Sequence, residues 1–438
     1  MSSRHPASGP PRTSSTPERD TTTKASTSRA GATSESAAPS TTAESRERTP
    51  APSSTPARAP APATPASAST SARSPAPAAA AAATAASPSS PVATGSGQGP
   101  ADHSQAPLLP ASHWVNPPEE FEDDDTDSAY GDDAASSTAS LSASILEYRT
   151  VHGRTFHSER GNAQSWNPND AQHDESMDIL HHVSTLMQDG KLHMADLDES
   201  RLGKVLDVGC GTGIWAIDFA DQYPSAEVIG VDISPSQPQW IPPNLKFEID
   251  DITQPWTYAP NSFDYIHMRW LIGAIPDWYG LFREVYRALK PGGIFESKES
   301  SAVITSDDGS VAPGSALDQW GKIFRESGKK FGRSFSIIEE DLQRKAMEAA
   351  GFVDIKVINM KTSLGPWPAD PKHKEIGQYA RLALEQDVEG FIVYVLTNAF
   401  GWTREEISVY AAHFRRELRS PSFHSWYAQR VVIGRKPY

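Results

Sequence analysis

Cysteine is almost absent from this sequence, because Cys210 is the single one among 438 residues. This count excludes an intramolecular disulfide and a zinc site built from several cysteines, and it fits a reducing compartment. Long apolar runs are also missing: FIVYVL at 391–396 is far shorter than the roughly 18–20 residues of a membrane span. Because signal-peptide, lipidation and retention motifs are missing too, the sequence predicts a soluble intracellular protein, in either nucleus or cytoplasm.

The first quarter of the chain has very few large apolar side chains. Between Ser2 and Pro107 the only aliphatic residue larger than alanine is Val92, and 20 of the 36 prolines lie before residue 119. Such a segment buries too little apolar surface to offset the roughly 1–2 kcal/mol per residue that backbone ordering costs. We therefore expect residues 1–126 to be a disordered Ser/Thr/Ala/Pro-rich region that ends in an acidic stretch.

Positive charge is scarce as well, and the net charge is -15 at pH 7. Residues 1–117 hold nine Lys/Arg against six Asp/Glu, whereas residues 118–140 hold nine acids and no base. Since no basic stripe of the kind that binds a phosphate backbone is present, direct binding to nucleic acid is not expected. The acidic block is interpreted either as a solvating linker or as a docking peptide for a basic partner.

The rest of the chain alternates short apolar strands with helices. The spacing predicts a helix from Asp170 to Gln188, with Asn169 or Asp170 as its N-cap. Apolar strands joined by helices are typical of a parallel sheet that is covered on both faces. The predicted fold class is therefore α/β, a doubly wound, mostly parallel sheet with a late antiparallel pair at its edge. Strands are expected at 204–209, 226–232, 245–249, 262–268, 293–298, 353–360 and 427–435, and later helices near 316–330, 339–350, 372–389 and 404–418.

The most informative stretch is LDVGCGTG, which ends at Gly213. A strand, a glycine loop and a helix in succession bring bare backbone N–H groups and a helix N-terminus close to a ligand. The spacing is G-x-G-x-G, with Gly209 and Gly211 as the earlier glycines, and an isoleucine stands where a dinucleotide fold needs a small residue. Asp207 is a poor neighbour for pyrophosphate but a good one for an amino-acid ammonium group. The loop therefore favours S-adenosylmethionine over NAD.

Acidic residues follow the next two predicted strands. Asp232 ends the second strand, where a carboxylate can accept hydrogen bonds from two ribose hydroxyls. Asp250 and Asp251 end the third strand, where they can receive an adenine amino group, and Ile252 offers an apolar wall. A glycine loop followed by these acids in this order predicts a cofactor site.

The chain resembles the fungal LaeA-like branch of the class I S-adenosylmethionine methyltransferases. The likeness covers most of 127–438 and includes the glycine-loop region, DSAYGDD at 127–133, YRTVHGRTFH at 148–157, FDYIHMRWL at 263–271 and YRALKPGG at 286–293. It implies a seven-stranded, Rossmann-like methyltransferase domain over 201–438, preceded by an extension and helix at 127–200. It also implies a role in fungal secondary metabolism or its regulation, beside velvet-type regulatory proteins in the nucleus.

Methyl transfer mainly requires alignment of donor and acceptor, and a general base adds about 10²–10⁴-fold. The candidates lie after strands four and five: His267, Glu296 and Glu299. A hydrogen-bonded structural histidine and solvent-facing carboxylates are the alternatives for these residues. Trp240 and Trp270 are candidates for stacking on adenine or lining the acceptor site, with ordinary packing as the alternative.

Four histidines, at 173, 181, 182 and 193, raise the question of a metal site. His181 and His182 are adjacent and so point to different helix faces, and no cysteine or carboxylate completes a set. No metal is expected. Two functions stay open: a methyltransferase acting on a small molecule or a protein, and a regulatory subunit that binds cofactor but works through a nuclear protein complex.

Overall fold

The structure is a computed structural model that describes residues 107–115, 146–158 and 165–438. The predicted disordered region falls outside the described residues except for 107–115. That segment holds the short 3-10 helix η2 (Ala111–Trp114), and Trp114 is 5 % exposed, with its ring 5.2 Å from the ring of Tyr410. The segment therefore packs on the folded part, although it lies inside the region predicted to be disordered.

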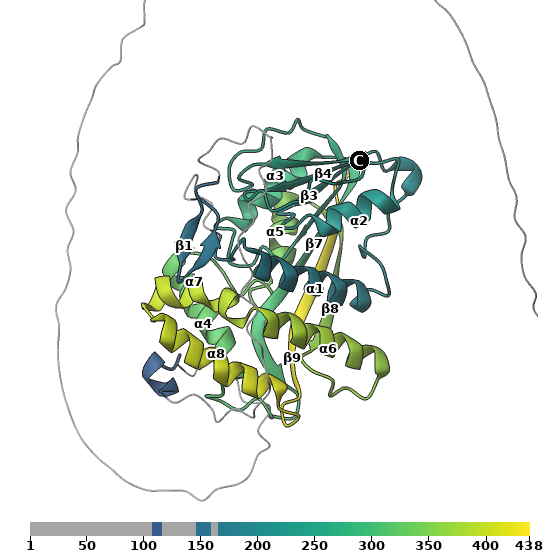
Figure 1. Ribbon diagram of the computed structural model, residues 1–438. Coiled ribbons are helices and arrows are strands. Elements are labelled where there is room, and N and C mark those ends of the chain that lie inside the picture. Colours follow the sequence, from purple (N-terminus) through teal and green to yellow (C-terminus); the bar gives the residue numbers. More distant parts are fainter. Residues whose placement is uncertain (1–106, 116–145, 159–164) are drawn as a thin grey trace, which may run out of the picture. The chain divides into compact units, whose positions relative to one another are not determined.

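A seven-stranded sheet forms the centre of the described chain (Figure 1). Its order is β5-β4-β3-β6-β7-β9-β8, and neighbouring strands are parallel except where β9 pairs with β7 and β8. This confirms the predicted mostly parallel sheet with its late antiparallel pair. The strands are β3 (Lys204–Val208), β4 (Glu227–Asp232), β5 (Leu245–Ile249), β6 (Phe263–Arg269), β7 (Leu289–Ser306), β8 (Val353–Ser363) and β9 (Ser425–Arg435). A separate hairpin pairs β1 (Arg149–Val151) with β2 (Arg154–Phe156).

Helices cover both faces of the sheet, as the continuous apolar strands require. In β3, Val205 packs with Trp215 on one face, whereas Leu206 packs in the cluster of Phe282 on the other. Strand order reverses between β3 and β6, and ligands of open α/β sheets bind at the carboxyl ends of the strands beside such a point. The helices are α1 (Ala171–Met187), α2 (Ile214–Gln222), α3 (Trp278–Ala288), α4 (Ala316–Phe331), α5 (Leu342–Ala350), α6 (Pro371–Gln386), α7 (Val388–Phe400) and α8 (Arg404–Arg419), with the 3-10 turn η4 (Glu199–Arg201).

The predicted helix at 372–389 is in fact the helix α6, and the chain turns at Asp387 into a further helix, α7, that the periodicity did not reveal. FIVYVL lies in α7 and is almost apolar all round because that helix is buried on most sides. Asp387 caps α7 by accepting from the Gly390 N–H and also binds Arg154 and His173. No helix in the described part of the chain is long and apolar enough to cross a membrane.

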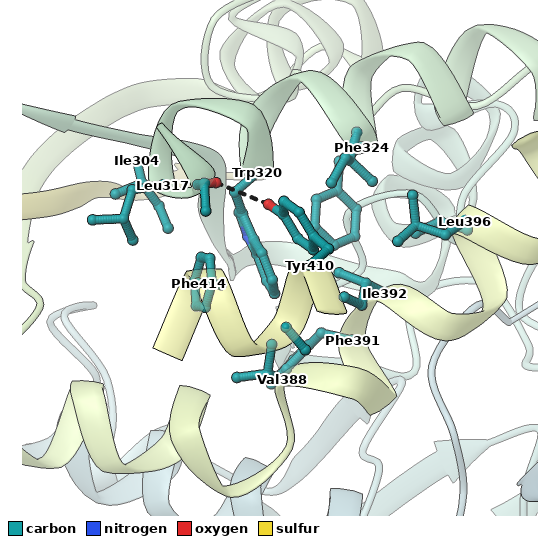
Figure 2. Packing of buried hydrophobic residues seen from close by; sticks show 14 of the residues in the cluster. Ile304, Leu317, Trp320, Phe324, Val388, Phe391, Ile392, Leu396, Tyr410 and Phe414 are labelled. Carbon is teal, nitrogen blue, oxygen red and sulfur yellow. Dashed lines mark hydrogen bonds between the residues drawn. The ribbon is translucent and has the colours of Figure 1, made fainter. Parts of the chain in front are cut away.

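A second core lies beyond the carboxyl end of the sheet, where α4, α7 and α8 pack together (Figure 1). Trp320 of α4 stacks on Phe414 of α8 with ring centroids 4.3 Å apart, and Phe391 of α7 lies beside them (Figure 2). The Tyr410 hydroxyl donates to the Ala316 carbonyl at 2.8 Å. The long strand β7 joins the two parts, since its residue Ile304 belongs to this second core. The helices α4, α7 and α8 thereby pack beyond the carboxyl ends of the strands.

Candidate functional site

A pocket, called the strand-end pocket below, opens at the carboxyl ends of β3, β4, β5 and β6. Its walls come from the glycine loop, the ends of β4 and β5, the segment after β6, and α1 with the residues before it. The pocket brings together six of the eight residues predicted to bind a cofactor, whereas Asp207 and Gly213 lie behind the lining. The six are Gly209, Gly211, Asp232, Asp250, Asp251 and Ile252.

The three loop glycines all have positive φ, but they serve different purposes. A Cβ on Gly209 would lie 2.5 Å from Leu271, and one on Gly213 would lie 2.4 Å from the Phe247 ring. These two glycines therefore allow the loop to pack on its neighbours. A Cβ on Gly211 would meet no atom within 4 Å among the described residues, and Gly211 lines the pocket. It is thus the glycine that leaves room for a ligand.

Asp232 ties the glycine loop to the end of β4. Its two carboxylate oxygens accept from the Gly211 N–H at 2.8 Å and the Ser234 N–H at 3.0 Å. Burial raises the pKa of Asp232. A carboxylate has about four lone-pair sites, so both oxygens keep capacity for ligand hydroxyls.

Asp250 and Asp251 lie beside Asp232, directly after the neighbouring strand β5. Asp251 accepts from the Thr253 N–H at 2.9 Å and from its hydroxyl at 2.6 Å, which fixes the turn. Asp250 is exposed and accepts from the Asp251 N–H at 2.8 Å. The backbone N–H of Asp250 bonds the Asp232 carbonyl, so both acidic strand ends hold one wall.

Asp207 lies below the loop, in a buried pair with His267. Asp207 Oδ1 is 2.8 Å from His267 Nδ1, and both side chains are about 2 % exposed. The imidazole stacks on Trp215 with ring centroids 3.7 Å apart. Burial lowers the pKa of His267 to about 4, so the ring is neutral at neutral pH. The predicted ammonium ligand and the predicted base therefore support each other underneath the pocket instead of lining it.

Glu296 and Glu299 are buried anchors, in contrast to the solvent-facing alternative considered for them. Glu296 accepts from the N–H groups of Met194 (3.0 Å) and Ala195 (2.7 Å). Glu299 accepts from the N–H groups of Leu271 (3.0 Å) and Ile272 (3.1 Å). Burial raises the pKa of Glu296 to about 7 and that of Glu299 to about 8. Neither carboxylate lines the strand-end pocket, but Glu299 holds the segment that does.

Helix α1 covers one side of this pocket, which no pattern in the sequence indicated. Asp174, in its first turn, and Met177 line the pocket, and Asp178 accepts from the Thr212 hydroxyl of the glycine loop at 2.8 Å. Burial, followed by the charges of Asp178, Asp170 and Asp232, raises the pKa of Asp174 to about 7. The contact joins segments more than 30 residues apart, so no local spacing announces it.

Trp270 stands between this pocket and a second one. Its φ is +56°, a left-handed backbone conformation that is unusual for a bulky residue. Its backbone N–H donates to the Lys298 carbonyl at 3.0 Å. The Arg269 guanidinium lies 4.4 Å from the indole centroid. Trp240, the other candidate for stacking, is 94 % exposed. Strained backbone of this kind concentrates at functional sites.

The second pocket, called the aromatic pocket below, lies between the sheet and the helices α4 and α7. Among its described lining residues no side chain is charged. Three residues, Asn167, Met177 and Trp270, line both pockets, so the two adjoin.

Three of the four histidines considered for a metal have separate side-chain partners. His173 pairs with Asp387, His181 with Asp218, and His193 with Tyr223. Within the described ranges no group of three or more His, Cys, Asp or Glu side chains is placed to hold a metal ion.

Comparisons with known proteins agree with this architecture. Residues 179–357 match the family described as "Methyltransferase domain". The chain is 36 % identical over 307 residues to "Methyltransferase pytC" of Aspergillus terreus, a match that covers 70 % of this chain and 93 % of the relative. It is 35 % identical to "Secondary metabolism regulator LAE1" of Cochliobolus heterostrophus, over 65 % of this chain and 94 % of that one. It is 31 % identical to "Secondary metabolism regulator laeA" of Aspergillus fumigatus, a match that covers 70 % of this chain and 82 % of the relative.

A mostly parallel seven-stranded sheet, with a glycine loop opening on an acidic pocket at its carboxyl edge, defines a Rossmann-like methyltransferase. The chain belongs to the LaeA-like family of S-adenosylmethionine-dependent methyltransferases. The residues present fit that cofactor. Four carboxylates suit its positive charges, and the buried polar atoms of Asn169 and His173 Nε2 on the pocket wall lack hydrogen-bond partners among the described residues.

Proposed function

We propose that this chain transfers a methyl group from S-adenosylmethionine, bound in the strand-end pocket, to an acceptor in fungal secondary metabolism or its regulation. The observation that carries the proposal is Gly211, which leaves the loop open to a pocket that four carboxylates also line. A cation gains from several nearby carboxylates, whereas an anionic dinucleotide is repelled by them.

Each predicted residue then has a role. Asp232 would accept from ribose hydroxyls, Asp250 or Asp251 from the adenine amino group, and Ile252 would contact the adenine ring. Asp174, on the α1 wall, would face the positively charged end of the cofactor. Gly209, Gly213 and Asp207 would act indirectly, by packing and supporting the loop.

When bound, the cofactor supplies an activated methyl group on a sulfonium, so the chain's main task is alignment, which is worth roughly 7–11 kcal/mol. We assign His267, Glu296 and Glu299 to positioning, because their polar atoms are engaged with Asp207 and with backbone N–H groups. Glu299 matters most among them, because it fixes the start of the segment after Trp270.

An active enzyme is favoured over a subunit that only binds cofactor, because the adjoining aromatic pocket gives an acceptor a place. Two of the relatives are named secondary metabolism regulators and one a methyltransferase. We propose the same setting for this chain, with a small molecule or a protein as acceptor and a velvet-type regulatory protein as partner in the nucleus.

Calorimetry on the full chain tests cofactor binding. Asp232→Ala should weaken S-adenosylmethionine binding at least tenfold, which is about 1.4 kcal/mol. Asp307→Ala is the matched control, since Asp307 is an exposed acid paired with Lys361 away from the pocket lining. Absence of measurable binding by the folded wild-type chain would overturn the proposal, and so would equal affinity of both variants.

A further inference from the structure

We propose that the aromatic pocket holds the methyl acceptor, and that this acceptor is a small apolar molecule with a hydroxyl group facing the strand-end pocket. The inference rests on the proposed methyl transfer and names its substrate class. It excludes a lysine or arginine side chain of a protein as the group that enters the pocket.

Aromatic side chains from distant parts of the chain form the walls. Trp166 precedes α1. Trp320 and Phe324 belong to α4, and Phe391 belongs to α7 (Figure 2). The Trp166 ring lies 5.2 Å from that of Phe324 and 5.3 Å from that of Phe335, centroid to centroid. Apolar side chains of β7, α1 and α6 also line the pocket. Apolar and aromatic walls of this kind favour an apolar ligand, because water leaves both surfaces on binding.

The dimensions limit what can enter. The aromatic pocket has a volume of about 120 Å³. An apolar cavity of about 150 Å³ holds one benzene molecule in an engineered protein. The part of the acceptor inside the pocket is therefore about one ring in size.

Several polar atoms on the lining are already engaged. Trp166 Nε1 donates to the Ile272 carbonyl at 2.8 Å, and the Ser301 hydroxyl donates to Glu339 at 2.5 Å. Asn167 Oδ1 is buried and has no hydrogen-bond partner among the described residues. Since a buried acceptor without a partner destabilises the protein, an O–H of the ligand is the group that would satisfy it.

Asn167 also stands at the point where transfer would occur. It lines both pockets, together with Met177 and Trp270. A hydroxyl bound to Asn167 Oδ1 thus lies next to the strand-end pocket while its apolar body stays among the aromatic rings. An ammonium group in the same position would lose its hydration against uncharged walls, which is costly.

The step is balanced without a further reactant. A lone pair of the hydroxyl oxygen forms the new O–CH₃ bond as the C–S bond of the sulfonium breaks. The bonding pair stays on sulfur, which becomes a neutral thioether, and the hydroxyl proton passes to bulk water.

The test uses the full chain with S-adenosylhomocysteine, and p-cresol as a one-ring hydroxyl probe, followed by saturation-transfer NMR. Ala302→Phe fills the pocket from β7, and Val303→Phe is the matched control, since Val303 is 40 % exposed and outside the lining. We expect Ala302→Phe to weaken p-cresol binding at least tenfold and Val303→Phe less than twofold. Both variants should keep S-adenosylhomocysteine affinity within twofold, which also shows that they fold.

A second comparison tests the hydroxyl. Asn167→Leu should weaken the binding of p-cresol severalfold. The binding of 4-methylanisole, which lacks the O–H, should not change. Asn167→Asp should restore p-cresol binding. The inference fails if p-cresol does not bind the chain that holds S-adenosylhomocysteine, or if Ala302→Phe binds it normally. It also fails if a lysine peptide is methylated at a rate that Ala302→Phe does not change. Loss of S-adenosylhomocysteine binding by the wild type would instead count against the proposed function.

Discussion

Four carboxylates line the strand-end pocket, at positions 174, 232, 250 and 251, whereas the described lining of the aromatic pocket carries no charge at all. The first pocket takes most of its walls from short segments that follow neighbouring strands. The second takes its walls from helices, strands and loops spread between Trp166 and Tyr427. Three of the four carboxylates thus follow strand ends and Asp174 comes from α1, whereas the uncharged pocket needs side chains that only the complete fold assembles.

The largest effect should come from breaking the loop of the strand-end pocket. Gly213→Ala places a Cβ about where the Phe247 ring lies and keeps φ at +80°, so we expect a loss of about 2–4 kcal/mol in the free energy of unfolding. Gly211→Ala should lose only about 1 kcal/mol, for the positive φ, yet bind S-adenosylmethionine at least tenfold more weakly. Denaturant melts and calorimetry on both variants measure the two quantities. Similar losses of stability would show that Gly211 is a packing residue too.

The second-largest effect is expected from Trp270, which lines both pockets. Trp270→Ala should lower the rate of methyl transfer about 10²-fold, because a loosened boundary misaligns donor and acceptor. Its affinity for S-adenosylmethionine should fall less than threefold. Single-turnover kinetics beside equilibrium binding separates the two effects. A fall in affinity as large as the fall in rate would assign Trp270 to the strand-end pocket alone.

Protonation of Asp174 should weaken cofactor binding in the strand-end pocket. Asp174, with its pKa raised to about 7, is mostly ionised at pH 8 and mostly protonated at pH 6. Because the ionised form attracts the cationic cofactor, affinity should fall about tenfold as pH drops from 8 to 6. Asp174→Asn should bind the cofactor weakly and lose most of the change in affinity between pH 8 and 6. Binding of p-cresol should not change with pH in either protein, and a parallel change would argue against two separate pockets.

The smallest effect is expected from Trp240. Its side chain is 94 % exposed, so Trp240→Ala should change the free energy of unfolding by less than about 0.5 kcal/mol. Cofactor affinity should stay within twofold. A larger loss in calorimetry would mean that the loop after β4 folds over the bound cofactor, which would extend the strand-end pocket.

Predictions from sequence succeeded where local geometry decides. Strand β3 was expected at 204–209 and spans Lys204–Val208, and Asp170 caps α1 as one of the two residues expected to. Helix α7 was missed, because an apolar run buried on most sides has no periodicity, and its cap Asp387 is held by Arg154 from over 200 residues away. The limits 1–126, 127–200 and 201–438 stay predictions.

The sequence by itself determined the α/β class, the glycine loop and the acids at the ends of β4 and β5. It could do so because backbone preference and the convergence of parallel strand ends are local rules. Only the tertiary structure decided that Asp207 binds His267, that Glu296 and Glu299 bind backbone N–H groups, and that α1 and α4 close the aromatic pocket. Those outcomes depend on contacts between residues far apart in the chain, and no spacing along the sequence encodes such contacts.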